Sequence, residues 1–395
     1  MDNYDVIIIG GGPAGMSAAL GAARAAGDTG DALGAAGGAG VTSAADAAMT
    51  PANPRIAIIE RAQALGGILN QCTHTGFGLT IFGEELTGQE YARRFSKRIL
   101  SSAVEILTDT MAMDINSDRT ITISGAMTGY RRIHATSIVL ATGCRERPIG
   151  ALPVAGTRPS GIYTAGAAQK MINLGGYDIG DRFVILGSGD VGLIVARELA
   201  MRGKEVVAVV EKEEECGGLP RNRINCLERY NIPLLTRATV TKVHGMPRIS
   251  GVTVNELTNG KQYTIACDAL ITSVGLIPER DLLDGISANM RHGVPDWLFL
   301  CGNAAFVHDV VDDVSIESES AGRNAAIAAL RPNFGGRTYI PEQNERKHWE
   351  PSGETQPGGE NIVCLACPKG CVAVKTRDGW AGLACGRSEP ERAAT

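Results

Sequence analysis

Short apolar runs, each followed by a stretch of helical composition, mark the first three quarters of the chain. One run covers residues 6–9 and leads into the Ala-rich stretch 14–26, and another covers residues 183–186 and leads into residues 193–202. Continuous apolar runs of this length are typical of strands that helices bury on both faces of a parallel sheet. Further runs lie at residues 56–59, 135–141, 205–210, 267–273 and 296–301. The pattern predicts an α/β fold.

The turn after the first apolar run contains three glycines at a spacing that is typical of dinucleotide-binding loops. Gly10, Gly12 and Gly15 form G-x-G-x-x-G, with Pro13 and Ala14 between the last two. Glycine permits a tight turn and the close approach of a pyrophosphate, and the N-terminus of the following helix attracts anions. The motif alone is weak evidence, but a strand before it and a helix after it make it a strong prediction of a dinucleotide site.

An acidic residue about 20 positions further on should bind the ribose. Glu60 ends the next apolar run, but it lies 50 residues after Gly10. The excess lies in residues 27–54, an Ala/Gly-rich segment of 28 residues, and removing it leaves a spacing of 22. We expect this segment to be a low-complexity surface insert, with a partner-docking loop as the alternative.

The same pattern recurs in the middle of the chain. Gly187, Gly189 and Gly192 repeat the spacing, with Asp190 and Val191 inside it, and Glu211 follows 24 residues after the first of them. A carboxylate there accepts ribose hydroxyls and repels a 2′-phosphate, which favours NAD(H) over NADP(H), although the neighbouring Lys212 weakens that preference. The alternative, that both motifs are only structural turns, leaves two complete fingerprints unexplained. Two Rossmann-like domains are therefore expected, one for FAD and one for NAD(H), with hydride passing between them.

Composition narrows the function classes. The 395 residues suit two or three domains, and a net charge of −5 argues against nucleic acid as a partner. The N-terminus lacks a cationic leader and no apolar run reaches about 18 residues, so we expect a cytoplasmic protein without a membrane span. In a reducing compartment, ten cysteines suggest metal or redox use for some of them.

Four of those cysteines lie close together near the C-terminus. Cys364, Cys367, Cys371 and Cys385 follow a polar, Pro- and Gly-containing linker at residues 336–360. A module of residues 361–395 is too small to be held together by its core alone, so a metal or disulfides should stabilise it. The three-plus-one grouping favours a [4Fe–4S] cluster, zinc is the alternative, and disulfides or no cofactor remain open.

Three further motifs give the chain a family resemblance. The segments "ATSIVLATGCRERP", "CDALITSVGLIPERDLL" and "DWLFLCGNAAFVHDVVDD" resemble the domain crossings and the last flavin motif of the two-dinucleotide-binding-domain flavoproteins, the pyridine nucleotide-disulfide oxidoreductase superfamily. The resemblance implies an FAD domain at 1–151 and 269–335, split by an NAD domain at 152–268. It adds binding residues to those of the two fingerprints: Arg61, Gly67, Thr142, Gly143, Gly302 and Asn303 for FAD, and Gly275 for NAD. Asn303 stands where the family usually has Asp.

Within this superfamily the chain lacks the features of a dithiol enzyme. Cys72 is single in its region, and Cys216 and Cys226 are ten residues apart, so we expect no dithiol disulfide reductase. The segments "GGILNQCTHTGFGL" and "EELTGQEYA" instead resemble the flavoprotein that accompanies bacterial glycerol-3-phosphate dehydrogenase subunits, and the subunits of opine oxidases and hydrogen cyanide synthase. This implies that Cys72 and His74 lie near the flavin as catalytic candidates. The alternative is an inert thiol and a wall histidine. His308 and Asp309 are expected at the start of a helix, where capping by Asp309 or Asp312 is the default and a site role for His308 near the flavin is the alternative.

The resemblance extends to the tail, which is similar to the small four-cysteine protein found beside that branch. The sequence thus predicts an FAD-dependent, NAD(H)-linked oxidoreductase that exchanges electrons through a C-terminal cluster with a partner flavoprotein dehydrogenase, for which glycerol 3-phosphate is the leading substrate by resemblance. The alternatives are a stand-alone NADH oxidase or peroxidase using Cys72, a catalytic opine- or amine-type oxidase subunit, and a non-catalytic nucleotide-binding scaffold with a zinc tail. The oligomeric state is left open.

Overall fold

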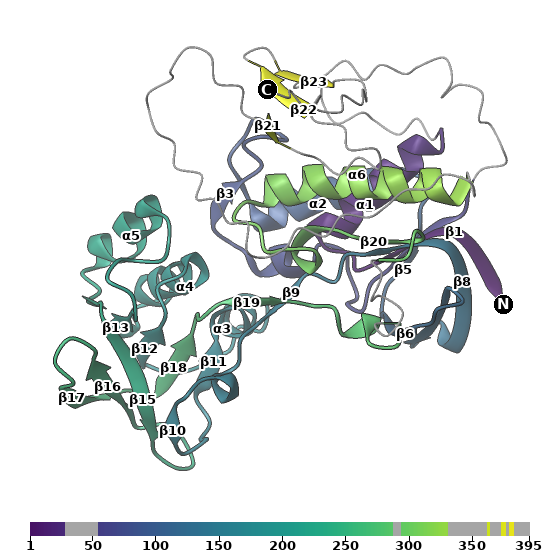
Figure 1. Cartoon of the computed structure of the whole chain (residues 1–395). Coiled ribbons are helices and arrows are strands. Elements are labelled where there is room, and N and C mark those ends of the chain that lie inside the picture. The colour runs from purple at the N-terminus through teal and green to yellow at the C-terminus, as the bar shows by residue number, and fades with distance from the viewer. Residues whose placement is uncertain (28–53, 287–293, 331–361, 364–372, 377–378, 383–395) are drawn as a thin grey trace, which may run out of the picture.

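A computed structural model describes residues 1–27, 54–286 and 294–330, together with three short strands between residues 362 and 382 (Figure 1). The interior of the expected insert, the linker at 336–360 and the four tail cysteines lie outside the described residues. The three short strands pair antiparallel; they are β21 (Ile362–Val363), β22 (Ala373–Thr376) and β23 (Gly379–Gly382).

The first sheet has seven strands in the order β5-β2-β1-β8-β7-β6, with β20 paired to β8. Their bounds are β1 (Asp2–Ile9), β2 (Ile56–Ile59), β5 (Glu105–Leu107), β6 (Thr110–Ile115), β7 (Thr120–Gly125), β8 (Gly129–Leu140) and β20 (Leu298–Leu300). Strands β5, β2, β1, β8 and β20 run parallel, so their carboxyl ends meet at one edge of the sheet. The first half of β8 forms an antiparallel meander with β7 and β6.

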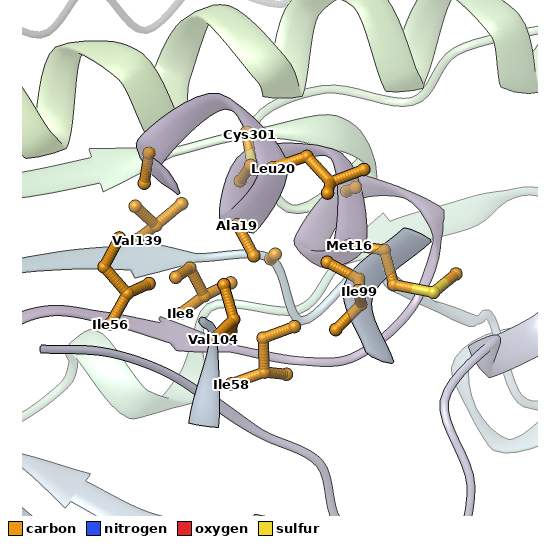
Figure 2. Packing of buried hydrophobic residues seen from close by; sticks show 14 of the residues in the cluster. Ile8, Met16, Ala19, Leu20, Ile56, Ile58, Ile99, Val104, Val139 and Cys301 are labelled. Atoms are coloured by element: carbon orange, nitrogen blue, oxygen red, sulfur yellow. The ribbon is translucent and has the colours of Figure 1, made fainter. Parts of the chain in front are cut away.

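Three helices cover one face of this sheet: α1 (Pro13–Ala25), α2 (Gly88–Leu100) and α6 (Val311–Leu330) (Figure 1). Figure 2 shows Ile8, Ile58 and Val139 of three neighbouring strands packed against the side chains of α1. The apolar runs seen in the sequence are therefore buried strands. Helix α2 begins with a capping box, in which Thr87 and Glu90 exchange hydrogen bonds between side chain and backbone.

Helices α1 and α6 pack with almost no space between their backbones. A Cβ added at Gly322 would overlap the carbonyl oxygen of Ala18, and one at Gly21 would overlap that of Glu319. Only glycine permits this approach. It fixes α1, whose first turn is the candidate anion site, against a helix about 300 residues later in the sequence.

The second sheet has five parallel strands in the order β11-β18-β12-β13-β14. Their bounds are β11 (Ile162–Thr164), β12 (Arg182–Leu186), β13 (Glu205–Val210), β14 (Leu234–Leu235) and β18 (Ala269–Thr272). Its helices are α3 (Ala165–Asn173), α4 (Asp190–Met201) and α5 (Pro220–Cys226). A smaller sheet beside it contains β10 (Ala155–Gly156), β15 (Ala238–His244), β16 (Gly251–Glu256) and β17 (Gln262–Ala266). The α/β fold with two Rossmann-like units is confirmed.

Two short strands link the two halves: β9 (Cys144–Glu146) pairs antiparallel with β19 (Leu276–Pro278), and Figure 1 shows them between the sheets. One expected boundary differs. Residues 269–272, assigned by sequence to the FAD domain, form β18 inside the second sheet, because that strand completes the parallel ladder between β11 and β12 before the chain returns.

Two helix starts also differ from expectation. Helix α4 begins at Asp190, three residues earlier than its apolar pattern suggests, because the glycine turn leads directly into it. Helix α6 begins at Val311, so His308 precedes it. The remaining short elements are β3 (Thr75–Phe77), β4 (Leu86–Thr87) and the single-turn helices η2 (Gly67–Gln71), η3 (Ile149–Ala151), η4 (Glu228–Tyr230), η5 (Asp281–Leu283) and η7 (Gly302–Ala304). Within the described ranges, no helix has the length and apolarity to cross a bilayer.

Candidate functional site: two nucleotide-binding edges

The carboxyl edge of the first sheet gathers the residues that the sequence predicted for FAD. Gly10 directly follows β1 and Glu60 directly follows β2, while Thr142 and Gly302 each lie two residues after the ends of β8 and β20. In open parallel sheets, ligands bind at this edge, where strand connections diverge to either side. The structure therefore brings these four segments together, although residue-level binding stays a prediction.

Glu60 is the anchor of the first glycine loop. Its Oε2 accepts the backbone N–H of Gly11 over 2.6 Å, and its Oε1 accepts that of Ala62 over 2.7 Å. The residue is 6 % exposed. A carboxylate oxygen has two lone-pair sites, so each oxygen retains one acceptor position for a ribose hydroxyl.

The second sheet repeats this arrangement almost atom for atom. Oε2 of Glu211 accepts the backbone N–H of Ser188 over 2.9 Å, and its Oε1 accepts that of Glu213 over 2.9 Å. The hydroxyl of Ser188 adds a third bond to Oε2, over 2.5 Å. Each acidic residue thus binds the middle residue of its glycine loop and the residue two positions after itself.

The first glycine of each loop is required by the strand beside it. Gly10 and Gly187 both have positive φ, +108° and +94°. A Cβ at Gly10 would overlap the carbonyl oxygen of Ala141, and one at Gly187 would overlap that of Ser273. The positive φ and the overlap of a Cβ each exclude any residue except glycine at these two positions.

Both glycine loops leave a helix N-terminus without a side-chain cap. The N-caps of α1 and α4 are Gly12 and Gly189, and neither helix has a side-chain cap hydrogen bond. Free N–H groups and the helix dipole favour an anion there. Above Gly12 the next loop passes close by, with the N–H of Gly66 donating to the Gly11 carbonyl over 2.8 Å, and a Cβ at Gly67 would lie 3.0 Å from the Cα of Gly12. The glycines therefore form a cradle that fits a pyrophosphate.

Four other residues predicted to bind nucleotides make no contact of this kind with a glycine loop among the residues that the structure describes. Arg61 is exposed, and Gly275 has positive φ with open space where a Cβ would point. Oδ1 of Asp190 accepts the N–H of Leu219 over 2.8 Å and the side-chain amide of Asn222 over 2.7 Å, which ties α4 to α5. Val191 is exposed beside it. Asp190 thus has a structural role, independent of whether it contacts a nucleotide.

Asn303 lies in a network at the end of β20. Its Oδ1 accepts the backbone N–H of His308 over 3.0 Å, and its Nδ2 lies 3.6 Å from the sulfur of Cys144. The ring of His308 also contacts Asn303, at 3.3 Å from Nδ1 to Oδ1, and its Nε2 lies 3.2 Å from Oε2 of Glu317. The same carboxylate oxygen accepts the N–H of Gly302 over 3.1 Å.

Arg280 and Thr142 each make a contact in this region that the sequence did not predict. Arg280 donates from Nε to the Ala304 carbonyl over 2.6 Å and from its guanidinium to the Ala305 carbonyl, and burial lowers its pKa. Thr142 donates to the Glu279 carbonyl over 2.6 Å. No sequence motif links either residue to its partner, so the sequence alone did not identify these contacts.

Cys72 is a buried thiol. Its sulfur lies 3.4 Å from the Ile68 carbonyl and 3.7 Å from Oε1 of Gln169. Burial, with a smaller contribution from Glu198, raises the pKa of Cys72 to about 12. A thiol in this state is a poor nucleophile, because the thiolate is the reactive form. The structure therefore argues against Cys72 as a peroxidatic residue.

His74 is better placed for chemistry. Its ring is half-buried, contacts Phe77 and has Nδ1 3.0 Å from the Thr75 carbonyl. A carbonyl only accepts, so Nδ1 carries the proton and Nε2 has a free lone pair in the neutral ring. Burial lowers the pKa of His74, which keeps it neutral near pH 7. The residue can accept a proton at Nε2.

A polar contact between the two halves lies beside these residues. Nε2 of Gln71 donates to the Gly166 carbonyl over 2.7 Å and to Gln169 over 3.2 Å, and Asn173 donates to the Gln71 carbonyl over 2.9 Å. Helix α3 of the second half thus covers η2 of the first. In the described ranges, no three His, Cys, Asp or Glu side chains form a metal-binding group; the predicted ligands Cys364, Cys367, Cys371 and Cys385 lie outside them.

Comparison with known proteins agrees with this geometry. The chain is 25% identical over 351 residues to an alkyl hydroperoxide reductase subunit of Staphylococcus aureus (strain MSSA476), and the match covers 83% of this chain and 58% of that protein. It is 27% identical over 310 residues to sarcosine oxidase subunit alpha of Rhizobium meliloti (strain 1021), where the match covers 74% and 26%. The chain thus spans under two thirds of the length of either relative.

The fold also has a solved counterpart, thioredoxin reductase of T. acidophilum, with a TM-score of 0.59, 20% identity, and coverage of 84% of this chain and 98% of that one. The matched family is that of pyridine nucleotide-disulphide oxidoreductases, so the comparisons do not support the expected exclusion of disulfide reduction. Residues 33–295 match the model for pyridine nucleotide-disulphide oxidoreductases. The chain therefore belongs to the pyridine nucleotide-disulphide oxidoreductase family, a family of FAD- and NAD(P)-dependent enzymes.

Proposed function

We propose that the chain is an FAD-dependent, NAD(H)-linked oxidoreductase that exchanges electrons with a partner flavoprotein dehydrogenase through an iron–sulfur centre in its C-terminal segment. The observation that carries the nucleotide part is the repeated loop geometry: Glu60 and Glu211 each bind two backbone N–H groups in the same pattern at the carboxyl edge of a parallel sheet. Hydride transfer from one dinucleotide to another requires two dinucleotide sites, and this chain has two loops of the kind that bind them.

The chain's own residues bind and orient in this proposal. The first turns of α1 and α4 hold the two pyrophosphates, and the two glutamates accept from ribose hydroxyls. Bound FAD would supply the capacity to take a hydride and release electrons one or two at a time. Asn303, fixed by His308, offers its amide near the end of β20, and Nε2 of His74 is available to accept a proton.

The nicotinamide nucleotide is proposed to be NAD(H). The loop after β13 carries Glu211, Glu213, Glu214 and Glu215, which are like-charged to a 2′-phosphate. Its one cation, Lys212, lies 3.8 Å from a carboxylate oxygen of Glu213, at the exposed end of the loop. The four carboxylates of the loop therefore outweigh the attraction of Lys212 for the 2′-phosphate of NADP(H).

The cluster in the tail and the partner subunit are proposed from cysteine spacing, the names of relatives and motif resemblance. The three-plus-one spacing of Cys364, Cys367, Cys371 and Cys385 favours four thiolate ligands for a [4Fe–4S] cluster, with zinc as the alternative. Both relatives described above are subunits by their names, which supports a multi-subunit assembly. Glycerol 3-phosphate is proposed as the partner's substrate from motif resemblance.

Disulfide reduction is the second candidate, and the comparisons favour it, since relatives of this fold include thioredoxin reductases. The described cysteines argue the other way. All six are free thiols, and Cys72, Cys226, Cys267 and Cys301 are buried. Burial raises the pKa of each of these four thiols. An exchange mechanism needs an accessible thiol with a resolving partner.

The test is anaerobic purification of the full chain, followed by an absorption spectrum, iron, sulfide and zinc analysis, and titration with NADH and NADPH. The proposal expects a yellow protein that NADH bleaches, with about four irons per chain. Zinc without iron would remove the electron relay and leave the flavin function. Rapid NADH-dependent reduction of an aromatic disulfide such as 5,5′-dithiobis(2-nitrobenzoate) would select the second candidate.

A further inference from the structure

Asn173, the last residue of α3, joins three segments of the chain through its side-chain amide. Its Nδ2 donates to the Gln71 carbonyl over 2.9 Å and to Oε2 of Glu198 over 3.1 Å. The same nitrogen lies 3.4 Å from the Thr73 hydroxyl. Its Oδ1 accepts from the Arg202 guanidinium over 3.0 Å. One half-buried side chain of the second half thus contacts the end of η2, the residues after it and the end of α4.

These partners determine which way the Asn173 amide points. The Gln71 carbonyl and the Glu198 carboxylate only accept, and a guanidinium only donates. A flipped amide would therefore set two donors against each other at Arg202 and two acceptors at the other contacts. Arg202 also donates to Oε1 of Glu198 over 3.3 Å, so Asn173, Glu198 and Arg202 form a closed ring of contacts. This ring holds the amide while its Nδ2 reaches the first half of the molecule.

The segment that the amide reaches contains the two residues that the sequence predicted near the flavin. Cys72 and His74 flank Thr73 directly after η2. Residues 72–74 belong to no helix or strand, and β3 begins only at Thr75. A segment without regular backbone pairing depends on individual contacts for its position.

We propose that Asn173 is a positioning residue: held by Glu198 and Arg202, it fixes residues 72–74 and with them the ring of His74. The second half of the molecule, which contains the second glycine loop, thereby sets the position of a residue in the first half. The value of this contact for the reaction rests on the proposed role of His74 as a proton acceptor; the positioning itself does not.

The charged groups near the His74 ring belong to the same contact. Burial has the largest effect on the pKa of His74 and lowers it. Arg197 of α4 also lowers this pKa, whereas Glu198 raises it. Arg221 of α5 approaches Gly76, where an added Cβ would lie 3.8 Å from its guanidinium. Without the amide contacts these charges remain and the burial of the ring decreases, so the pKa should rise toward its ordinary value.

Chemical labelling of the full chain tests the positioning without any electron transfer. Diethyl pyrocarbonate acylates a ring nitrogen that bears a lone pair, iodoacetamide alkylates a thiolate, and mass spectrometry of peptides gives both rates. The test variant is Asn173→Leu, which has similar size and no charge but can neither donate nor accept. His74 and Cys72 should each react faster in it by about fivefold or more, the factor for one net hydrogen bond. Arg202→Ala should act in the same direction, because it opens the ring of contacts without touching residues 72–74.

Asn116→Leu is the matched control for this substitution. The Nδ2 of Asn116 also contacts a carboxylate and a threonine hydroxyl, at 3.2 Å from Oδ1 of Asp114 and 3.3 Å from Oγ1 of Thr120. These contacts lie after β6, in the antiparallel meander of the first sheet. The control variant should therefore keep both labelling rates at their wild-type values.

Cys226, which is buried in the core of the second half, separates local from general loosening. It should react as slowly in Asn173→Leu and Arg202→Ala as in the wild-type chain. Wild-type labelling rates for residues 72–74 in Asn173→Leu overturn the proposal. An equal rise for Cys226 in both variants also overturns it, because the contacts would then hold the fold and not this segment.

The pH profile of NADH oxidation with a dye acceptor measures the consequence for the reaction separately. The rise in the pKa of His74 should move the acidic limb to higher pH in Asn173→Leu and leave it in place in Asn116→Leu. Faster labelling together with an unmoved acidic limb would support the positioning and contradict the role of His74 as proton acceptor. The two failures are therefore distinguishable.

Discussion

Glu60 accepts the backbone N–H of Gly11 over 2.6 Å, although 49 residues separate them. The bond joins the end of β2 to the glycine loop after β1, and Glu211 makes the matching bond to Ser188 in the second sheet. The same acidic side chain thus shapes the loop and offers acceptors to a ribose. The pair provides matched variants, since each is the control for the other.

Glu60→Gln should weaken FAD binding by about tenfold or more and leave NADH binding unchanged. A glutamine can accept only one of the two N–H groups that Glu60 binds, and its NH₂ would face the other, which leaves a buried donor without an acceptor. Glu211→Gln should do the reverse. Dissociation constants for FAD and NADH on both variants measure this. Equal losses of both nucleotides in both variants would contradict two separate sites.

Gly322→Ala should destabilise the chain by about 1–3 kcal/mol, because the added methyl overlaps the Ala18 carbonyl and forces α1 and α6 apart. Denaturant unfolding of the FAD-free chain measures it. Gly150→Ala is the matched control, since its Cβ would meet nothing within 4 Å and its φ is not positive. Similar stability for the two variants would show that the helices do not pack as closely as described.

Cys72 should resist alkylation in the folded chain. With its pKa raised to about 12, only about one thiol in ten thousand is ionised at pH 8, so iodoacetamide should react at least a hundredfold more slowly than with the chain in urea. Because the folded pKa is the higher one, the stability that this thiol contributes is present below the unfolded value of about 8.5 and is lost as pH rises toward 12. Mass spectrometry of labelled peptides measures the rate, with the partly buried Cys216 as reference. Fast labelling of Cys72 at pH 8 would restore the peroxidase hypothesis.

His74→Gln should remove an acidic limb from the pH profile of electron transfer. Burial lowers the pKa of His74, so the wild-type residue is a neutral base at pH 7 and is lost as a proton acceptor only below its ordinary value of about 6.5. The wild-type rate should therefore fall as the pH decreases below the ordinary histidine value of about 6.5, and the variant should be slower and level across that range. Steady-state NADH oxidation with a dye acceptor measures both profiles. An unchanged acidic limb in the variant would show that His74 lines the site without accepting the proton.

The features that the sequence predicted are local ones. Each glycine loop directly follows its strand, and Glu211 lies 24 residues after Gly187. Glu60 was found once the insert was removed. The features that it missed are contacts that belong to no sequence motif: Arg280 with Ala304, Gln71 with Gln169, and Glu317 with His308. The position of β18 was missed for a related reason, because an apolar run does not tell which of two sheets it completes.

The central claim is that one chain holds two dinucleotides between which a hydride crosses. Anaerobic titration of the FAD-loaded full chain with NADH, followed by its visible absorbance, tests this most directly. The account predicts complete bleaching at about one NADH per flavin, abolished or much slowed in Glu211→Gln while the flavin stays bound. A chain that binds no FAD, or a bound flavin that NADH leaves oxidised, would contradict it.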